Sequence, residues 1–515
     1  MALARRKLEG SLTDWALAAA GLLSMGFAWW WPGSLTCAAL AWLSSFFLCS
    51  YCLREGGYLK LWLCGAALQM TGFYWLFKTI SHFGGFGILP ALAIFGLFVL
   101  YSALQFPLFL FVRRRLPAAL DHAALRSALA WALVEYLPLR IFPWYAGHTQ
   151  LAFAPLAQSA DIAGAIGVSF LMFWVCESLA RIVFMKEKGR ALIFSAAALA
   201  LALAYGMNRL SYFAAPQSAP VKVAVVQANI SIAEKHNQRF IEANLQRYLQ
   251  LSRPIAAPDR LIIWPESVIT DPLPLGAGHA ALKSALAPLL ELLAPMITGA
   301  LTADYSRRTY HNSAVALYAD GHVAAPYHKR ILMPFGEYMP FSRAAPWLKK
   351  VFETPDFEPG IAANVFEFEL APGTEQADRI KVAANVCYED IVGSLARDAT
   401  REGAQLLVNH TNDAWYGDTV APYQHHLIAS FRAIENRRYF IRSTNTGYTG
   451  IIDPTGKTIA GLPVFSEGVL TASVRPHSEL SPYTACIGDS PWLLLTIGLA
   501  FTLAVRAVLA RNRKA

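Results

Sequence analysis

The first 210 residues alternate long apolar runs with short connections, which predicts a bundle of transmembrane helices. Most of these runs approach the ~20 residues that a bilayer core demands. The predicted spans are 13–30, 34–53, 58–79, 87–111, 124–140, 160–183 and 191–209, with an eighth at 491–509. The fifth span is the weakest because it contains Glu135 and Arg140. A cleaved signal peptide is the alternative for the first run, but further spans follow at once without a clear small-residue cleavage site.

The positions of the basic residues predict how these spans are oriented. Connections on one side of the bundle carry Arg54, Lys60, Arg113, Arg114, Arg115, Lys186, Lys188 and Arg190. The connections on the other side, 31–34 and 82–87, have almost none. Because positive loops stay in the cytoplasm, we expect both termini to be cytoplasmic and residues 210–490 to lie outside.

Residues 210–490 have a different pattern, with short β-rich strings separated by turns and helices, which is typical of a layered α/β domain. The expected strands are 221–229, 261–266, 296–302, 381–387, 405–411, 439–445, 446–453 and 457–463. The expected helices are 232–252, 279–294, 391–402 and 422–437, with a β-hairpin around Asp320-Gly321 that follows the strand 296–302 and a turn at Pro454-Thr455-Gly456. We therefore predict a seven-helix transmembrane domain over 1–210, an extracytoplasmic α/β domain over 211–488, and a transmembrane helix with a cytoplasmic tail over 489–515.

Composition supports a membrane protein and excludes two other classes. The chain is 55% hydrophobic and 15% charged, whereas soluble domains carry about a quarter charged residues. The net charge of +9 falls largely at the ends of apolar runs, so no basic patch indicates nucleic-acid binding. Five of the seven cysteines lie in apolar runs, which argues against a disulfide framework and leaves Cys387 almost alone in the polar segment.

Three stretches of the polar segment hold candidate chemistry: LIIWPES at Glu266, YHKRILMPFGEY at Lys329, and KVAANVCYED at Cys387. A carboxylate at a strand end beside an aromatic ring is partly desolvated, which suits Glu266 to be a general base. Cys387 would need that base, and a cation at Lys329, because a free thiol is mostly protonated at neutral pH. Glu337 is a second acid that could orient Lys329 or the substrate. Each residue alone also fits a structural role, as a surface acid, a solvated lysine or an inert buried thiol.

A histidine-assisted nucleophile is the competing arrangement. His410 and the pair His425-His426 are candidate bases, but the chain has no GxSxG nucleophile elbow. The histidines also lack the spacing of metal ligands, so we predict no metal.

The stretches WPES, HKRILMPFGEYMP, NVCYED and NHTNDAWYGDTVAPYQHH resemble the nitrilase superfamily. Combined with seven preceding spans and one following span, they resemble the family of apolipoprotein N-acyltransferases in the bacterial inner membrane. The resemblance implies an αββα sandwich with Glu266 as general base, Lys329 as oxyanion-stabilising cation and Cys387 as nucleophile. It also places Glu337, Tyr388 and Glu389 at the family's supporting positions. One departure is visible after the first strand, where the family often has a tryptophan and this chain reads EKHNQ, with His236 nearest.

Three aromatic residues are candidate contacts for lipid. Trp415, in NDAWYGD, falls on a family motif and is expected to line the acyl entrance. Trp347 and Phe352 lie at helical spacing with Leu348 and Val351, beside two lysines, which suits a lid over residues 341–352 that dips into the membrane interface. An amphipathic segment packed on the domain would show the same pattern.

The resemblance implies a ping-pong reaction. A phospholipid gives an acyl chain to Cys387 as a thioester, and the α-amine of a diacylglyceryl-cysteine at an apolipoprotein N-terminus takes the chain as an amide. No cofactor is implied, and we expect a monomer in the inner membrane with its catalytic domain in the periplasm. The alternatives are a membrane-anchored amidase with a soluble substrate and a non-enzymatic transporter or scaffold. Eight spans favour a lipid substrate over the amidase, and the scarcity of ionisable residues deep in the spans disfavours transport.

Overall fold

The computed structural model describes residues 2–54, 56–137, 140–235, 237–276, 278–340, 342, 344, 346–347, 356–370 and 378–512. These residues form two compact units. The helical unit takes in Met1–Ala214, Thr419–Glu435 and Ser481–Ala515. The sheet unit takes in Ala215–Asp418 and Asn436–Leu480. Each unit is described by itself below.

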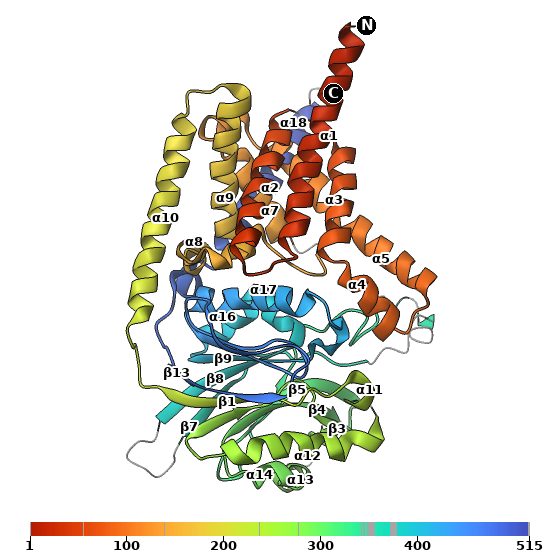
Figure 1. Cartoon of the computed structure of the whole chain (residues 1–515), viewed down its shortest axis with the longest axis vertical. Helices are drawn as coiled ribbons and strands as arrows, with labels where there is room; N and C mark the ends of the chain where they lie inside the picture. Colours follow the sequence, from red (N-terminus) through yellow and green to blue (C-terminus); the bar gives the residue numbers. More distant parts are fainter. Residues whose placement is uncertain are drawn as a thin grey trace. The chain divides into compact units, whose positions relative to one another are not determined.

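The helical unit is built from apolar helices that satisfy their backbone hydrogen bonds internally, as a lipid environment requires. Its helices are α1 (Ala2–Ala28), α2 (Leu35–Leu53), α3 (Tyr58–Gly72), α4 (Trp75–Lys78), α5 (Ile88–Ser102), α6 (Gln105–Arg115), α7 (Arg126–Tyr136), α8 (Ala154–Ala157), α9 (Ala160–Met185), α10 (Arg190–Ala214), α17 (Ala421–Asn436) and α18 (Ser490–Asn512) (Figure 1).

Four helical stretches in the described residues are long and apolar enough to cross a membrane: Leu35–Leu53, Ile88–Arg115, Ala160–Met185 and Arg190–Ala214. A shorter apolar helix covers Ser490–Val505. The membrane character predicted from the sequence is therefore confirmed at these stretches, and the number of eight spans stays a prediction.

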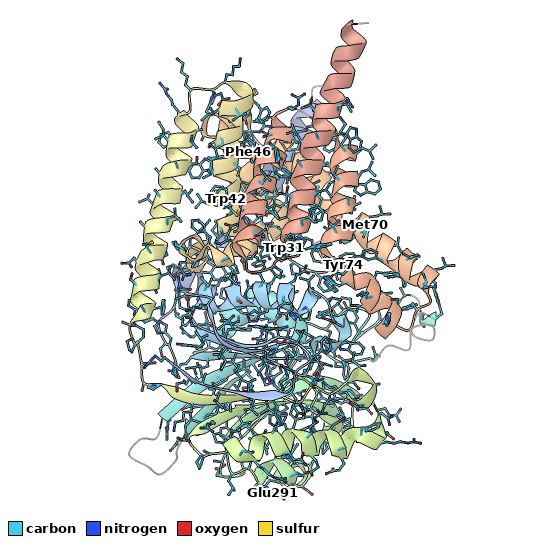
Figure 2. All side chains as sticks on the ribbon, in the orientation of Figure 1. Trp31, Trp42, Phe46, Met70, Tyr74 and Glu291 are labelled. Atoms are coloured by element: carbon cyan, nitrogen blue, oxygen red, sulfur yellow. The ribbon has the colours of Figure 1, made fainter. Side chains whose placement is uncertain are left out.

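Large apolar side chains project outward from the helical unit. Figure 2 labels Trp42 and Phe46 on α2 and Met70 on α3. The side chain of Met70 is 55% exposed and that of Trp31 is 50% exposed. Since soluble proteins rarely leave such side chains clustered in water, this exterior fits a lipid surround.

Helix α17 is held in the helical unit by polar side chains near both of its ends. The amide of Gln424 donates to the carbonyl oxygens of Trp29 (2.7 Å) and Gly72 (3.0 Å) and accepts from the indole of Trp75 (2.9 Å). Near the other end, the Glu435 carboxylate accepts from the Ala165 N–H at 3.1 Å, just after Gly164 breaks α9 at a φ of +68°. This helix lies within the predicted catalytic residues 211–488, yet its contacts group it with the membrane helices.

The sheet unit contains two sheets in its described residues (Figure 1). The first has the order β13-β1-β2-β4-β5-β6, with β3 also paired to β4, and the second has the order β12-β11-β10-β9-β8-β7. The strands of the first are β1 (Val221–Gln227), β2 (Arg260–Ile263), β3 (Ile269–Pro274), β4 (Met296–Asp304), β5 (Thr309–Leu317), β6 (Tyr327–His328) and β13 (Gly468–Val474). The strands of the second are β7 (Val365–Leu370), β8 (Asp378–Val386), β9 (Leu406–Thr411), β10 (Tyr439–Thr444), β11 (Thr449–Ile452) and β12 (Thr458–Leu462).

The two sheets share one apolar core. Val223 and Val225 of β1 belong to the same buried cluster as Val382 of β8 and Val408 of β9. These central strands pair in parallel and are buried on both faces, which explains their almost continuous apolar sequences. A second cluster joins the outer face of the first sheet to α12 (Ile241–Ser252), α13 (Gly278–Ala285) and α14 (Ala287–Leu290). Helix α16 (Gly393–Arg401) packs against β8, so the predicted layered α/β domain is confirmed.

Some predicted elements differ in detail. The helix expected over 232–252 is divided into α11 (Ile232–Lys235), a short turn and α12, because the Asn237 side chain accepts from the Arg239 N–H and starts a new helical segment. The helix expected over 279–294 is divided where Pro288 opens α14. Strands β3, β7 and β13 were not predicted. Strand β13 could not be recognised locally because its pairing partner β1 lies far away in the sequence. The paired residues are 253 positions apart at Val221↔Val474 and 241 positions apart at Gln227↔Gly468.

Candidate active site

Cys387 stands at the point where a buried strand ends. Strand β8 stops at Val386, and Cys387 opens a single 3₁₀ turn over Cys387–Ile391. Its φ is +52°, a conformation that side chains with a Cβ rarely adopt. The amide of Asn409, on the neighbouring β9, donates to the main-chain oxygen of Cys387 at 3.0 Å. A strained backbone held in this way is typical of functional positions. The predicted strand leading into Cys387 is present, and the role of the thiol as nucleophile stays a prediction.

Glu266 and Glu337 converge on a shared amide. The side chain of Asn312, on β5, donates to Glu266 Oε1 at 2.8 Å and to Glu337 Oε1 at 2.9 Å. The other oxygen of Glu337 accepts from the Met333 N–H at 2.8 Å. Both carboxylates are largely buried. Asn312 therefore fixes the spacing of two carboxylates that would otherwise repel each other.

Lys329 follows β6 directly and is buried, with 1% of its side chain exposed. Its Nζ lies 2.6 Å from Glu337 Oε2. Burial opposes the charge on Lys329, but the negative charges of Glu337, Cys387 and Glu266 outweigh that effect and raise its pKa above the ordinary value. Lys329 is thus held in its charged form, with Glu337 as its ion-pair partner.

The electrostatics of the thiol and the carboxylate are complementary. Burial raises the pKa of the Cys387 thiol, and the charge of Glu266 raises it further, while Lys329 acts in the opposite direction. Burial likewise raises the pKa of the Glu266 carboxyl, opposed by Lys329. The thiol therefore rests protonated, and the nearby carboxylate has an increased affinity for its proton. Such a pair can generate a thiolate when a substrate arrives.

Glu389 accepts four hydrogen bonds from two separate segments of the chain. Its Oε1 accepts from the N–H groups of Arg330 (2.6 Å) and Ile331 (3.0 Å). Its Oε2 accepts from the Tyr327 hydroxyl and the Val386 N–H, both at 2.8 Å. The carboxylate is fully buried. Glu389 thus ties the segment that carries Lys329 to the strand that presents Cys387, which is a positioning role.

The loop that carries Glu266 is anchored at several points. His410 Nδ1 lies 2.6 Å from the Trp264 carbonyl oxygen, and burial lowers the pKa of His410 to about 4, so the imidazole is neutral. The Gly299 N–H donates to Pro265 O at 3.0 Å. A Cβ on Gly299 would lie 2.6 Å from the Glu266 Cα, so only glycine allows this approach. His410, a candidate base in the sequence, instead holds the main chain beside Glu266.

The remaining predicted site residues are placed as follows. Tyr388 lies partly buried in the turn after Cys387, and Trp415 lies in the 3₁₀ turn Asp413–Tyr416 with 37% of its surface exposed. Trp347 is 61% exposed. Phe352 and His236 lie outside the described residues. The contacts of these side chains with lipid stay predictions.

Asn312 and Lys235 are two site residues that the sequence did not reveal. Asn312 is one of several polar residues in the first half of strand β5, beside His311 and Ser313, so nothing in the sequence distinguishes it. Lys235 lies in a polar string that is typical of a solvated helix, yet it is buried and donates from Nζ to the Glu266 carbonyl oxygen at 2.6 Å. Within the described ranges, no group of three or more metal-ligating side chains occurs.

Comparison with known proteins finds a matching family model for each of the two parts of the chain. Residues 222–479 match the family model described as carbon-nitrogen hydrolase, and residues 15–177 match the one described as the apolipoprotein N-acyltransferase N-terminal domain. A curated apolipoprotein N-acyltransferase of Geobacter metallireducens is 33% identical, covering 87% of this chain and 86% of its own length. Relatives of the same name from Methylococcus capsulatus and Azotobacter vinelandii are each 31% identical, covering 85% and 96% of this chain and 85% and 95% of their own lengths.

Proposed function

This chain belongs to the apolipoprotein N-acyltransferase family, and on that premise we propose that it transfers an acyl chain from a phospholipid to the N-terminal diacylglyceryl-cysteine of apolipoproteins through a thioester on Cys387. The observation that carries the proposal is the arrangement around Cys387. A strained strand-end thiol lies in the field of a buried carboxylate, Glu266, and a buried permanent cation, Lys329.

In the first half-reaction, Glu266 removes the proton from Cys387 Sγ as the sulfur attacks the ester carbonyl carbon of the phospholipid. The developing oxyanion is stabilised by the Lys329 ammonium, with the N–H of Tyr388 as a second donor. The intermediate collapses with cleavage of the carbon–oxygen ester bond. Glu266 returns its proton to the departing alkoxide, so that a lysophospholipid leaves and the acyl chain remains on sulfur.

In the second half-reaction, the α-amine of the diacylglyceryl-cysteine attacks the thioester carbonyl. Glu266 accepts a proton from the attacking nitrogen, and the same cation stabilises the second oxyanion. Cleavage of the carbon–sulfur bond yields the amide, and Glu266 reprotonates the Cys387 thiolate. Both steps use one base and one cation, which is consistent with a single compact site.

The membrane arrangement follows from the same premise. We place eight spans in the inner membrane, both termini in the cytoplasm and the catalytic sheet unit in the periplasm, on the strength of the basic residues in the short loops. An active site near the outer leaflet could be reached from the membrane by both the phospholipid and the lipid-modified apolipoprotein. Trp415, Trp347 and Phe352 are the aromatic residues that we expect to contact them, and the chain would act as a monomer without a cofactor.

The first test is intact-protein mass spectrometry of the full-length protein after incubation with phospholipid vesicles alone. We expect a mass increase of one acyl chain that neutral hydroxylamine removes, that a diacylated lipopeptide discharges, and that Cys387→Ala abolishes. Lys329→Ala and Glu266→Ala should reduce adduct formation by about 10²-fold or more, as for the loss of an oxyanion donor or a general base. An adduct that persists in Cys387→Ala would overturn the mechanism. Hydrolysis of small amides without any adduct would favour the amidase alternative.

A further inference from the structure

Lys235 is a buried cation beside the proposed site that the mechanism above does not use. It ends the short helix α11 and has 7% of its surface exposed. Burial lowers the pKa of Lys235 to about 8, and the negative charges of Glu266 and Cys387 act in the opposite direction. The ammonium therefore lies within the electrostatic field of the two groups that would exchange a proton.

Lys235 offsets negative charge that the other residues of the site leave uncompensated. Lys329 forms an ion pair with Glu337 at 2.6 Å, so these two residues together are close to neutral. Glu266 and Cys387 share one further negative charge, which lies on the carboxylate before proton transfer and on sulfur afterwards. Among the residues that the structure describes, no ion pair joins Lys235 to a carboxylate. The positive charge of Lys235 is therefore available to stabilise the negative charge that moves between Glu266 and Cys387.

Lys235 also holds the main chain at Glu266. Its Nζ donates to the Glu266 carbonyl oxygen at 2.6 Å. The next residue, Ser267, has a φ of +48°, which is unfavourable for a residue with a side chain. Gly299 fixes the loop from the other strand, since the Ser267 N–H would lie 2.5 Å from a Cβ at that position. Lys235 thus supplies an anchor for a backbone turn that is strained in isolation.

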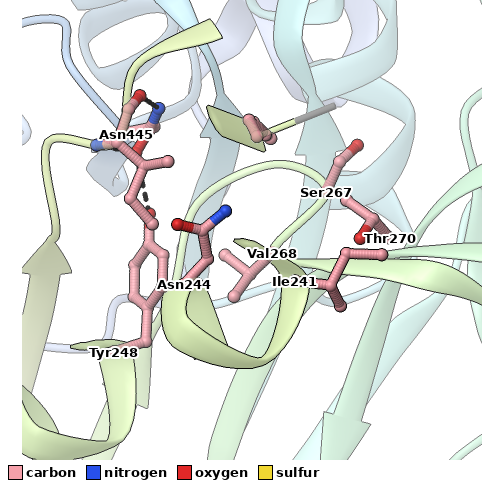
Figure 3. A pocket seen from close by; sticks show the side chains of 9 residues that line it. Ile241, Asn244, Tyr248, Ser267, Val268, Thr270 and Asn445 are labelled. Atoms are coloured by element: carbon pink, nitrogen blue, oxygen red, sulfur yellow. Dashed lines mark hydrogen bonds between the residues drawn. The ribbon is translucent and has the colours of Figure 1, made fainter. Parts of the chain in front are cut away.

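A small pocket of mixed apolar and polar lining explains how Lys235 keeps a charge without a carboxylate partner. Lys235 lines it together with Asn244, Tyr248, Ser267 and Asn445. Figure 3 shows Asn244, Tyr248 and Asn445 on one side of the pocket and Ser267 on the other. Buried pockets with several polar groups typically hold water, and water would accept the remaining N–H groups of the ammonium.

We propose that Lys235 is a positioning residue of the acyl transfer, which anchors the Glu266 main chain and balances the negative charge exchanged between Glu266 and Cys387. The inference rests on the proposed roles of Glu266 and Cys387. It predicts that loss of the charge slows thiolate formation at Cys387 without weakening the binding of phospholipid.

The test compares wild type with Lys235→Met, which removes the charge, and Lys235→Gln, which keeps a donor for the Glu266 carbonyl. Lys222→Met is the control, because Lys222 is an exposed lysine of β1 whose partner is the exposed Asp259. The rate of Cys387 acylation is measured by mass spectrometry against phospholipid concentration and pH. We expect Lys235→Met to lower the maximal rate at least about 30-fold and to move the acid limb of the pH profile up by about one unit, with KM within about twofold.

The direction of the pH shift follows from charge. A cation favours the ionised forms of Glu266 and Cys387, so its removal raises their pKa values and moves the limb to higher pH. Lys235→Gln should shift the limb equally while losing less thermal stability. The proposal is refuted if the acid limb of the pH profile does not shift in either neutral variant, even if their thermal stability falls. If Lys235→Met does not fold, Lys235→Gln alone decides the outcome. A wild-type protein that forms no adduct at all would instead refute the proposed function.

Discussion

The four hydrogen bonds of Glu389 support a quantitative prediction for Glu389→Gln. Each oxygen of the carboxylate accepts two hydrogen bonds, from Arg330 and Ile331 on one side and from Tyr327 and Val386 on the other. A glutamine must present an NH₂ group to one of these pairs. The Tyr327 hydroxyl can rotate to accept a hydrogen bond, but a main-chain N–H cannot.

One or two buried N–H groups are therefore left unpaired in Glu389→Gln. Each costs about 1–3 kcal/mol, so the sheet unit should lose about 1–6 kcal/mol of stability. The loss should also let the Lys329 segment move relative to Cys387, and small displacements of this kind lower rates by about 10²-fold.

The assay measures thermal unfolding and the Cys387 acylation rate of the full-length protein in the same detergent. Glu367→Gln is the matched control, since Glu367 is an exposed acid of the edge strand β7. We expect the control to match wild type in both measurements. Wild-type stability and acylation in Glu389→Gln would refute the view that this carboxylate positions Lys329 against Cys387.

Two further predictions concern proton transfer and the helical unit. The pKa of Glu266 is raised above the ordinary value of a glutamate, so the base is lost as pH falls through that raised value. The acylation rate should therefore decline at a higher pH than an ordinary glutamate would give. A decline centred at or below pH 4.5 would contradict this prediction. Gln424→Leu removes three hydrogen bonds of α17, so the carbonyl oxygens of Trp29 and Gly72 lose this buried donor. Its melting temperature should fall by several degrees, consistent with about 2–6 kcal/mol, whereas the exposed control Gln250→Leu on α12 should melt like wild type.

Local patterns in the sequence were sufficient for the membrane helices, the alternation of strands and helices, and the three stretches around Glu266, Lys329 and Cys387. The physical reason is that each signal is short in range. An apolar run must match the bilayer, and a parallel strand buried on both faces must be apolar throughout. Strand ends are also where a chain can present a polar side chain, so a glutamate, a lysine and a cysteine at such ends were recognisable as candidates.

Tertiary structure alone decided which groups hold the site together. Asn312 bridges two carboxylates from different segments. Glu389 collects four donors from two segments, and Lys235 is buried although its neighbours in the sequence are polar. Helix α17 has the sequence of an ordinary α/β helix, but contacts with residues more than 250 positions away group it with the membrane helices. These interactions form only where segments that are distant in the sequence come into contact. The energy of a buried hydrogen bond or charge is set by those contacts and not by the neighbouring residues in the sequence.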